Sequence, residues 1–388
     1  MEKYNKRKRG GILVSNVFIE ENTLKEIANT IRNKTGKTNK MLPKEMINEI
    51  SSISGTSTNS EKFIDGRLVL FEDDFNNLNL NNWIAENRGN FQNGAIQYYT
   101  SRKENVRVEN SNLIITARKE NYKNKTWTSG QVISRGLQEF KYGKIEARIK
   151  MPTSQGMWPA FWTLGRWYGS DSARQWPSCG EIDIVEHLNN NEGYYTVLHY
   201  NKDNLKDDIQ SGGLNNTDNI NYSDYNIYGV DWTESGFDFY INNILVRHLD
   251  TPVGYESSFS HAHSLLISLQ IGGWPGNPDN TTPDINEMYV DWVRVLAPVG
   301  INSRIFPTSI ELTGGNKSIE ANENIDLFAD CKPNNCTEQT ITWKSENPFI
   351  ATVKGGTVKS LTGGDCDIYA IAKNGIFAKY NTTLNRNY

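Results

Sequence analysis

Three carboxylates lie within six residues of one short segment, 181–186, whose sequence is Glu-Ile-Asp-Ile-Val-Glu. The aliphatic residues between the acids favour a β-strand, and strand side chains alternate faces, so Glu181 and Asp183 should project together. Glu186 is out of step by one residue unless a β-bulge between Asp183 and Glu186 turns it to the same face. Three like charges on one face raise one another's pKa, which ordinary sheets avoid. The pattern therefore favours a catalytic acid cluster over a chance cluster on a solvated strand.

Such a cluster suits the cleavage of glycosidic bonds. That reaction needs a carboxylic acid that protonates the leaving oxygen and a second carboxylate that attacks the sugar or activates water. Near neighbours on one strand suit the separation of about 5–5.5 Å found in retaining enzymes better than the longer inverting separation. We therefore predict Glu181 and Glu186 as the pair. Asp183 between them would hydrogen-bond the nucleophile, and its charge would raise the pKa of the acid.

The composition indicates a globular protein of two or three domains. The chain has 388 residues, of which ten are Trp and eighteen are Tyr, and flat aromatic side chains stack on sugar rings. Its formal net charge of −4 gives no reason to expect a nucleic acid or an anionic membrane as partner. No apolar run approaches the roughly 18 residues of a membrane span. The partner expected first is a polysaccharide.

The cysteines at positions 179, 331, 336 and 366 lack the CxxC spacing and the His-rich setting of a metal site. Cys179 lies two residues before Glu181, which suggests a nucleophile, but the sequence places no His to activate it. We therefore interpret Cys179 as a small packing residue. A disulfide of Cys331 with either Cys336 or Cys366 is compatible with the sequence, which does not establish one.

Residues 63–298 have the pattern of an all-β domain. No amphipathic helix is predicted there, and short alternating strands between turns rich in Asn, Gly and Asp are predicted at 105–108, 113–117, 144–149 and 237–241. Nine of the ten Trp residues lie in this domain. We predict a two-sheet sandwich of the jelly-roll type, preceded by a Ser-rich linker at 54–62.

Residues 1–53 are predicted to form a small helical hairpin. Apolar residues recur with helical spacing from Leu24 to Ile31 and again from Met46 to Ile50. A hairpin this small cannot bury enough surface alone, so it should dock on its own copies, forming a homo-oligomer, or on a larger assembly. No signal peptide is expected, because only the short apolar stretch 11–14 follows the basic residues near the N-terminus.

The segments 31–36 and 41–46 resemble a short module of the tail and receptor-binding proteins of bacteriophages. That resemblance implies a place in the virion, with other tail proteins as partners of the N-terminal module. It would also explain the expected lack of a signal peptide, because virion proteins are released by lysis. The alternative is a generic helical hairpin used for oligomerisation.

Residues 306–388 form a third region whose pattern suits an immunoglobulin-like sandwich. Short strands are predicted at 309–312, 340–345 and 350–353. The sequence from Trp343 to Val358 resembles the bacterial Ig-like domains of group 2. Because no acid pair or metal cluster occurs here, we interpret the region as a spacer or adhesion module. The alternative is an independent carbohydrate-binding module.

The middle domain as a whole resembles one family. Its acid segment is similar to the E-x-D-x-x-E signature of glycoside hydrolase family 16, in the bulged form of laminarinases. Further matches follow in family order over roughly 66–297, namely Asp73–Asn76, Gln97–Thr100, Tyr142–Arg148, Met157–Trp162, Gly272–Gly276 and Tyr289–Val295. The resemblance implies a jelly roll and an endo-acting, retaining hydrolase of β-glucan, with β-1,3-glucan expected first.

The resemblance also implies roles for individual residues. Glu181 takes the place of the nucleophile, Asp183 of the assisting acid and Glu186 of the general acid/base. The residues implied in substrate binding are Trp158, Trp162, His199, Trp274, Asn93, Gln97 and Arg135. Core packing is the alternative for the two tryptophans at 158 and 162, which share one strand face, and for the histidine.

No cofactor is expected for catalysis, but family members often bind a structural calcium ion far from the cleft. The matching positions here are Asp74 and Asn112, through backbone carbonyls, and Asp291, through its side chain. Three departures from the family pattern concern the cleft walls: the loop 272–276 lacks the Asn that usually precedes its Trp, Ser268 stands where Asn is common, and the segment 166–177 is longer than usual. They leave the acids intact and the identity of the substrate open.

Two other function classes compete with an enzyme. A glycan-binding module would adsorb to a polysaccharide without cleaving it, but it has no use for three mutually repelling acids. A purely structural tail protein would use the middle domain as a spacer, which the concentration of tryptophan there disfavours.

Overall fold

The structure is a computed structural model of the chain. It describes residues 11–14, 17–20, 61–76, 82–91, 93–166, 175–202, 205–217, 219–315, 318–319 and 324–384. The predicted helical hairpin lies outside these residues. Within the same N-terminal module the described residues form antiparallel strands instead, β1 (Gly11–Val14) and β2 (Val17–Glu20). Both are rich in β-branched and aromatic residues, which favour extended backbone.

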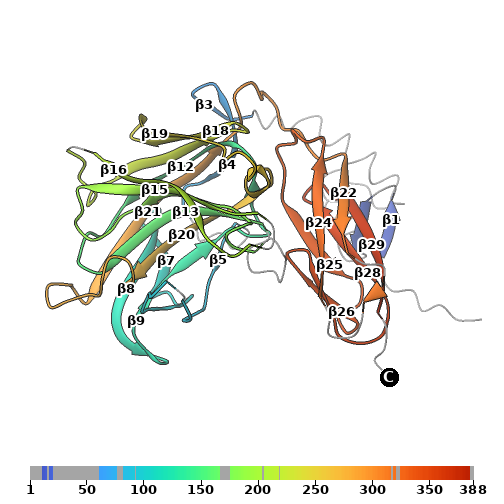
Figure 1. The fold of residues 1–388 in the computed structure, drawn as a ribbon, viewed down its shortest axis with the longest axis horizontal. Helices are drawn as coiled ribbons and strands as arrows, with labels where there is room; N and C mark the ends of the chain where they lie inside the picture. The colour runs from blue at the N-terminus through green and yellow to red at the C-terminus, as the bar shows by residue number, and fades with distance from the viewer. Residues whose placement is uncertain are drawn as a thin grey trace, which may run out of the picture.

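The middle region is a sandwich of two sheets (Figure 1). The first, named here the acid sheet, carries the strand with the three carboxylates. Its strand order is β16 (Ile209–Asn216), β15 (Gly193–Tyr200), β14 (Glu181–Glu186), β13 (Met157–Gly165), β20 (His263–Ile271), β10 (Gln131–Ile133) and β5 (Ile84–Ala85), with β11 (Glu139–Phe140) also pairing with β20. The strands named here are antiparallel to their neighbours.

The second sheet backs the first. Its order is β19 (Ile244–Asp250), β18 (Gly236–Ile241), β17 (Asn226–Trp232), β12 (Gly143–Lys150), β21 (Ile285–Leu296), β8 (Asn112–Tyr122), β9 (Lys125–Ser129) and β6 (Tyr98–Tyr99), joined by β3 (Phe63–Ile64), β4 (Arg67–Asp73) and β7 (Val106–Glu109). A short 3-10 helix, η2 (Glu256–Ser258), precedes β20. Among the described residues no helix is long and apolar enough to cross a membrane.

Alternate residues of the two sheets meet in one apolar core. Phe161, Ile182 and Leu198 of the acid sheet are fully buried with Ile145 and Val230 of the second sheet. Because strand side chains alternate, the neighbours of these core residues must lie on the outer face of the acid sheet. The core thus fixes which side chains are available to a ligand.

Residues 309–384 form a smaller sandwich, the Ig-like domain, beside the first (Figure 1). One sheet has the order β22 (Ser309–Gly314), β24 (Asn324–Lys332), β27 (Thr357–Ser360) and β26 (Ala351–Lys354). The other has β23 (Ser318–Ile319), β29 (Phe377–Leu384), β28 (Gly364–Ala372) and β25 (Ile341–Ser345). The expectation of a two-sheet sandwich followed by a second, smaller one is confirmed. The four cysteine thiols are free and buried, so no disulfide staples this domain.

Candidate active site

The acid strand β14 contains the bulge that its sequence requires. Asp183 pairs with Val197 and Glu186 with Tyr195, so β14 spans three residue steps where its partner β15 spans two. The extra residue brings Glu186 back to the face of Asp183, because it restores the two-residue alternation. The predicted bulge is confirmed, and the three acids share the outer face of the sheet.

The entry into β14 is fixed by a glycine. Gly180 has a φ of +77°, and a Cβ atom at this position would lie 2.0 Å from the backbone oxygen of Ser258. Only glycine combines this left-handed backbone with so close an approach. The position of Gly180 therefore sets the starting point from which Glu181 projects.

Each glutamate receives a hydrogen bond from an indole N–H. Trp176 Nε1 donates to Glu181 Oε2 at 2.8 Å, and Trp158 Nε1 donates to Glu186 Oε1 at 2.9 Å. Glu181 is half-buried, whereas Glu186 is only 8% exposed. The two carboxyl groups are thus oriented separately, by donors from opposite sides of the cluster.

The central acid is held by a histidine. His199 of β15 lies opposite Glu181, and its Nε2 is 3.2 Å from Asp183 Oδ2. On its other side, His199 Nδ1 is 2.9 Å from Asp208 Oδ2. One side-chain ligand atom from each of Glu181, Asp183 and His199 lies within 4.8 Å of the other two. The imidazole therefore bridges two carboxylates inside the acid cluster.

These surroundings shift the titration of the site. Burial, together with the charge of Asp183, raises the pKa of Glu186 to about 8. Burial and Asp183 likewise raise the pKa of Glu181, but the charge of His199 and the N–H of Trp176 oppose that rise. Burial lowers the pKa of His199, yet the contacts of its ring nitrogens with the carboxylates of Asp183 and Asp208, which accept hydrogen bonds from the imidazolium, outweigh burial and raise this pKa to about 12. The environment thus favours a proton on the pair of glutamates and a charged imidazolium at neutral pH.

Aromatic rings surround the Glu186 end of the cluster. Trp274 is 49% exposed, with ring centroids 5.7 Å from Trp158 and 4.4 Å from Tyr195. Trp162, on the same strand face as Trp158, donates from Nε1 to Ser268 Oγ at 3.1 Å. Trp274 therefore offers an accessible platform, while Trp158 and Trp162 form the floor and orient polar groups.

The weaker substrate candidates fall into two groups. Asn93 Nδ2 donates to Gln270 Oε1 at 2.7 Å, and Arg135 lies 3.7 Å from Glu86, so both belong to polar networks at the borders of the acid sheet. Gln97 differs, because it is fully buried and its Oε1 accepts from the backbone N–H of Ile271. The side chain of Gln97 thus supports the end of β20, and its expected contact with a sugar hydroxyl stays a prediction.

The expected calcium residues are engaged with protein groups. Asp291 Oδ2 forms a 2.6 Å ion pair with Arg148, and Asn112 Oδ1 accepts from the hydroxyl of Tyr225 at 2.7 Å. Asp74 accepts from the side chain of Asn76. A guanidinium therefore neutralises Asp291, the one side-chain ligand expected. The ligands expected from Asp74 and Asn112 are backbone carbonyls, which these side-chain contacts do not test, so the calcium site stays a prediction.

Three residues of the site were not predicted from the sequence: Trp176, Tyr195 and Asp208. Trp176 precedes Pro177 in the segment that is longer than usual, and its ring centroid lies 5.9 Å from that of His199. The unusual length of that segment was the sequence feature that pointed toward a role for it in the site. For Asp208 the sequence held no signal, because its contact with His199 depends on how the chain returns from β15 to β16. Cys179, interpreted as a packing residue, is fully buried, and burial raises the pKa of its thiol.

Comparisons with known proteins agree with this geometry. The profile of glycosyl hydrolases family 16 matches residues 93–294, and that of the bacterial Ig-like domain (group 2) matches residues 307–383. A clotting factor G alpha subunit from Tachypleus tridentatus is 33% identical over 251 residues, which are 63% of this chain and 36% of that protein. A beta-glucanase from Rhodothermus marinus is 32% identical over 216 residues, 52% of this chain and 74% of that enzyme.

Among solved structures, the laminarinase catalytic domain from Thermotoga maritima superposes with a TM-score of 0.53 at 32% identity. The superposition covers 60% of this chain and 98% of that domain. The chain therefore spans all but a small part of a laminarinase catalytic domain, but only about a third of the clotting factor subunit.

Proposed function

The chain belongs to glycosyl hydrolase family 16, and we propose that it is a retaining, endo-acting hydrolase of β-glucan with β-1,3-glucan as its preferred substrate. The observation that carries the proposal is the bulge in β14, which places Glu181, Asp183 and Glu186 on one open face. A retaining glycosidase needs such a pair of carboxyl groups, one protonated and one ionised.

Glu186 is suited to be the general acid. With a pKa of about 8 it carries a proton at neutral pH, and the indole of Trp158 holds its other oxygen. In the first step this proton passes to the glycosidic oxygen, so that the leaving sugar departs as a neutral hydroxyl. In the second step the same carboxylate accepts a proton from the attacking water.

Glu181 is suited to be the nucleophile. Its carboxylate would attack the anomeric carbon as the glycosidic bond breaks, forming a glycosyl ester that water then hydrolyses. Trp176 and the imidazolium of His199 stabilise the ionised carboxylate, and Asp183 joins the imidazolium to the pair. The pKa values of both glutamates are raised, so the two compete for one proton. The proposal assigns that proton to Glu186, because the imidazolium of His199 and the N–H of Trp176 favour the charged form of Glu181.

The preference for β-1,3-glucan is supported by two observations. The exposed ring of Trp274, beside Tyr195, gives a stacking surface next to Glu186. The Rhodothermus marinus relative is by name a beta-glucanase, and the Thermotoga maritima structure is by name a laminarinase.

The test is glycan digestion by the purified full chain. Laminarin, lichenan, agarose and carrageenan are incubated with the wild-type protein and with Glu181→Gln, and the products are sized. We expect short oligosaccharides from laminarin first, and a loss of about 10⁴-fold or more in the variant, with its melting temperature preserved. Reducing sugar released by Glu181→Gln at the wild-type rate would overturn the assignment of the nucleophile.

A second candidate function is glycan binding without cleavage. One relative, from Penaeus monodon and 31% identical over 140 residues, is by name a beta-1,3-glucan-binding protein. Retention of laminarin on the protein with no product from any of the four glycans would favour this function. The shielded proton on Glu186 argues for cleavage, since binding alone needs no titratable acid.

Delivery on a phage tail is a separate proposal, supported only by the resemblance of the sequence of residues 31–46 to a module of phage tail proteins. It predicts that the protein sediments with purified virions and that it assembles with tail proteins or with its own copies through residues 1–53. Negative-stain imaging and co-sedimentation test it. Recovery of the protein only as free monomer outside virions would contradict it.

The structural calcium expected from the family resemblance remains a separate prediction. It would stabilise the jelly roll without entering the reaction. An unchanged melting temperature in EDTA, which the ion pair of Asp291 with Arg148 leads us to expect, would set it aside.

A further inference from the structure

Two arginines bridge the jelly roll and the Ig-like domain in the same manner. The first is Arg166, at the end of β13 and only 8% exposed. Its guanidinium donates to the backbone oxygens of Ala329 at 2.8 Å and Gln339 at 2.6 Å, both in the Ig-like domain. It also lies 3.4 Å from the buried carboxylate of Glu139 in the jelly roll. A buried arginine with a carboxylate partner and two carbonyl acceptors joins the two domains tightly.

The second bridge is Arg304, in the connection between the two domains. It donates to the backbone oxygens of Val69 at 2.9 Å and Leu70 at 2.6 Å in the jelly roll. Its Nη1 forms a 2.7 Å ion pair with Glu338 of the Ig-like domain. Each arginine therefore has two carbonyl acceptors and one glutamate, which makes them a matched pair at two places on one interface.

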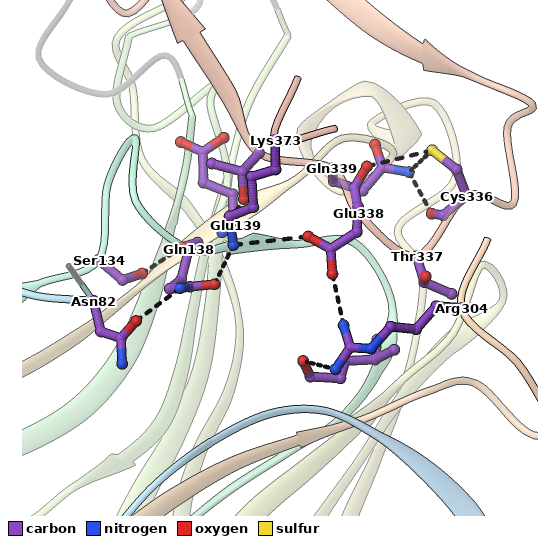
Figure 2. Close-up of polar contacts among 12 residues, drawn as sticks. Asn82, Ser134, Gln138, Glu139, Arg304, Cys336, Thr337, Glu338, Gln339 and Lys373 are labelled. Atoms are coloured by element: carbon purple, nitrogen blue, oxygen red, sulfur yellow. Dashed lines mark hydrogen bonds and ion pairs between the residues drawn. The ribbon is translucent and has the colours of Figure 1, made fainter. Parts of the chain in front are cut away.

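Further polar contacts between the two domains lie near the Arg304 bridge (Figure 2). Lys373 of the Ig-like domain donates to Gln138, which in turn donates to Asn82 at 2.8 Å. The backbone N–H of Glu139 donates to Thr340 Oγ1 at 3.0 Å. Several directional contacts between buried or half-buried groups distinguish this interface from that of a freely jointed spacer.

An apolar contact extends the interface onto the outer face of the acid sheet. On β24, Phe328 lies between the buried Leu327 and Ala329, so alternation points its ring out of the Ig-like domain. The ring packs against a buried cluster to which Trp162 also contributes, formed by Ile133, Leu164, Cys179 and Leu266.

This cluster belongs to the same sheet face as the acids. Leu266 pairs with Trp162, and Trp162 pairs with Asp183, so these three side chains share one face. Leu266 would be open to solvent there, yet it is fully buried in the presence of Phe328. The Ig-like domain therefore covers one end of the acid face.

The same contacts hold the segment that carries Trp176. Cys179 packs in the cluster beneath Phe328, and the backbone N–H of Gly165, next to Arg166, donates to Gly180 at 3.0 Å. Trp176 lies three residues before Cys179 and donates to Glu181.

We propose that the Ig-like domain is a working part of the catalytic unit rather than a spacer. Arg166 and Phe328 are positioning residues: through the backbone bond of Gly165 with Gly180 and through the packing of Cys179, they hold residues 175–180 and keep the Trp176 indole on Glu181. The effect of these residues on kinetics rests on the proposed hydrolysis of glucan.

The test compares Arg166→Gln with Arg304→Gln in the full chain. Hydrogen exchange is measured for the amides of Cys179 and Gly180, which donate to Gln175 and Pro177 at 3.1 and 2.9 Å. We expect exchange to become about tenfold faster in Arg166→Gln and to stay unchanged in Arg304→Gln. Arg166→Gln leaves the buried carboxylate of Glu139 without its cation, so R166Q/E139Q serves as a second variant. Phe328→Ala probes the apolar contact with the buried cluster.

The kinetic arm uses laminarin hydrolysis as a function of pH. Asp183, Glu186 and His199 face Glu181 in every variant, so only the Trp176 contact changes. Loss of the Trp176 N–H should move the acidic limb of kcat/KM to higher pH in R166Q/E139Q and in Trp176→Phe alike. The triple variant R166Q/E139Q/W176F should shift the acidic limb little further than R166Q/E139Q or Trp176→Phe does, because all of them act through the contact of Trp176 with Glu181.

Two results would overturn the inference. One is unchanged exchange at Cys179 and Gly180 in Arg166→Gln, R166Q/E139Q and Phe328→Ala. The other is equal acceleration in Arg304→Gln, which would show general loosening. Exchange needs no turnover, so a failure of the proposed hydrolysis, seen as no product from the wild-type chain, is distinguished from a failure of this inference.

Discussion

The indole N–H of Trp158 donates to Oε1 of Glu186 across the bulged pairing of β13 with β14. The bond connects the floor of the site to its acid, and Trp274 packs edge-on against the same indole at 5.7 Å. Trp158 therefore orients the carboxyl group of Glu186 and also supports the exposed ring of Trp274. Substrate binding and proton transfer share a single support.

Replacing Trp158 by Phe should move the alkaline limb of the pH profile. The N–H of Trp158 lowers the pKa of Glu186 against the effect of burial, so its loss raises that pKa above about 8. The acid then keeps its proton to higher pH, while kcat/KM at pH 6 falls about tenfold because the carboxyl group is less well oriented. Kinetics on laminarin from pH 4 to 10 measure both effects. Trp162→Phe is the control, since Trp162 donates to Ser268 and should leave the limb in place.

Replacing Glu186 by Ala should remove the alkaline limb altogether. In the wild-type enzyme kcat/KM should fall as pH rises through about 8, where Glu186 loses its proton. The variant should lose about 10²–10⁴-fold on laminarin, and much less on an aryl glycoside whose leaving group needs no proton. Equal losses on both substrates would contradict the role of Glu186 as general acid.

The acid strand could be predicted from sequence because its logic is local. Alternation and the one-residue mismatch between Asp183 and Glu186 demanded a bulge, and β14 contains it. The same alternation placed Trp158 and Trp162 on one face. These inferences needed only the period of a strand and the cost of clustered charge.

The partners of the acids were harder to predict because they come from tertiary contacts. Trp176 reaches Glu181 from a segment without regular alternation, and Asp208 reaches His199 from beyond the end of β15. Gln97 is a further case, since this fully buried polar side chain accepts from the backbone N–H of Ile271 at the end of β20. Nothing in the local sequence tells a cleft glutamine from a buried one.

The interface with the Ig-like domain was equally hidden. Phe328 alternates with buried residues, so sequence alone marks it as an ordinary exposed position of a small sandwich. Its role emerges only when the jelly roll is placed beside it.

Replacing Trp274 by Ala should weaken substrate binding more than catalysis. The ring is half-exposed, packs at a tilt against Tyr195 and has no hydrogen bond to the acids among the described contacts, so KM should rise about tenfold with kcat nearly unchanged. Trp292→Ala is the matched control, because Trp292 is a partly exposed tryptophan of the second sheet stacked under Arg294. A drop in kcat with unchanged KM would mean that Trp274 serves the chemistry instead of binding.

Replacing Asp208 by Asn should weaken both the stability of the fold and the nucleophile. Asp183 and Asp208 raise the pKa of His199 from 6.5 to about 12. This pairing stabilises the folded protein fully below pH 6.5 and is lost as pH rises through about 12. His199 in turn lowers the pKa of Asp208 below 3.8, a contribution lost as pH falls through that lowered value. We therefore expect the variant to lose about 1 kcal/mol at pH 7, and progressively less below pH 3.8.

Denaturant unfolding at pH 3 and pH 7 measures this effect of Asp208→Asn, and kcat on laminarin should fall about tenfold, because the imidazolium that supports Asp183 and Glu181 is less well held. Asp238→Asn is the matched control, since Asp238 lies 2.6 Å from His248 on an exposed part of the second sheet. Its loss should change the free energy of unfolding by less than about 0.5 kcal/mol and leave kcat unchanged. If both variants had the same kcat as the wild type, the contact of Asp208 with His199 would be structural only, and the charge on the imidazolium would have to come from Asp183 alone.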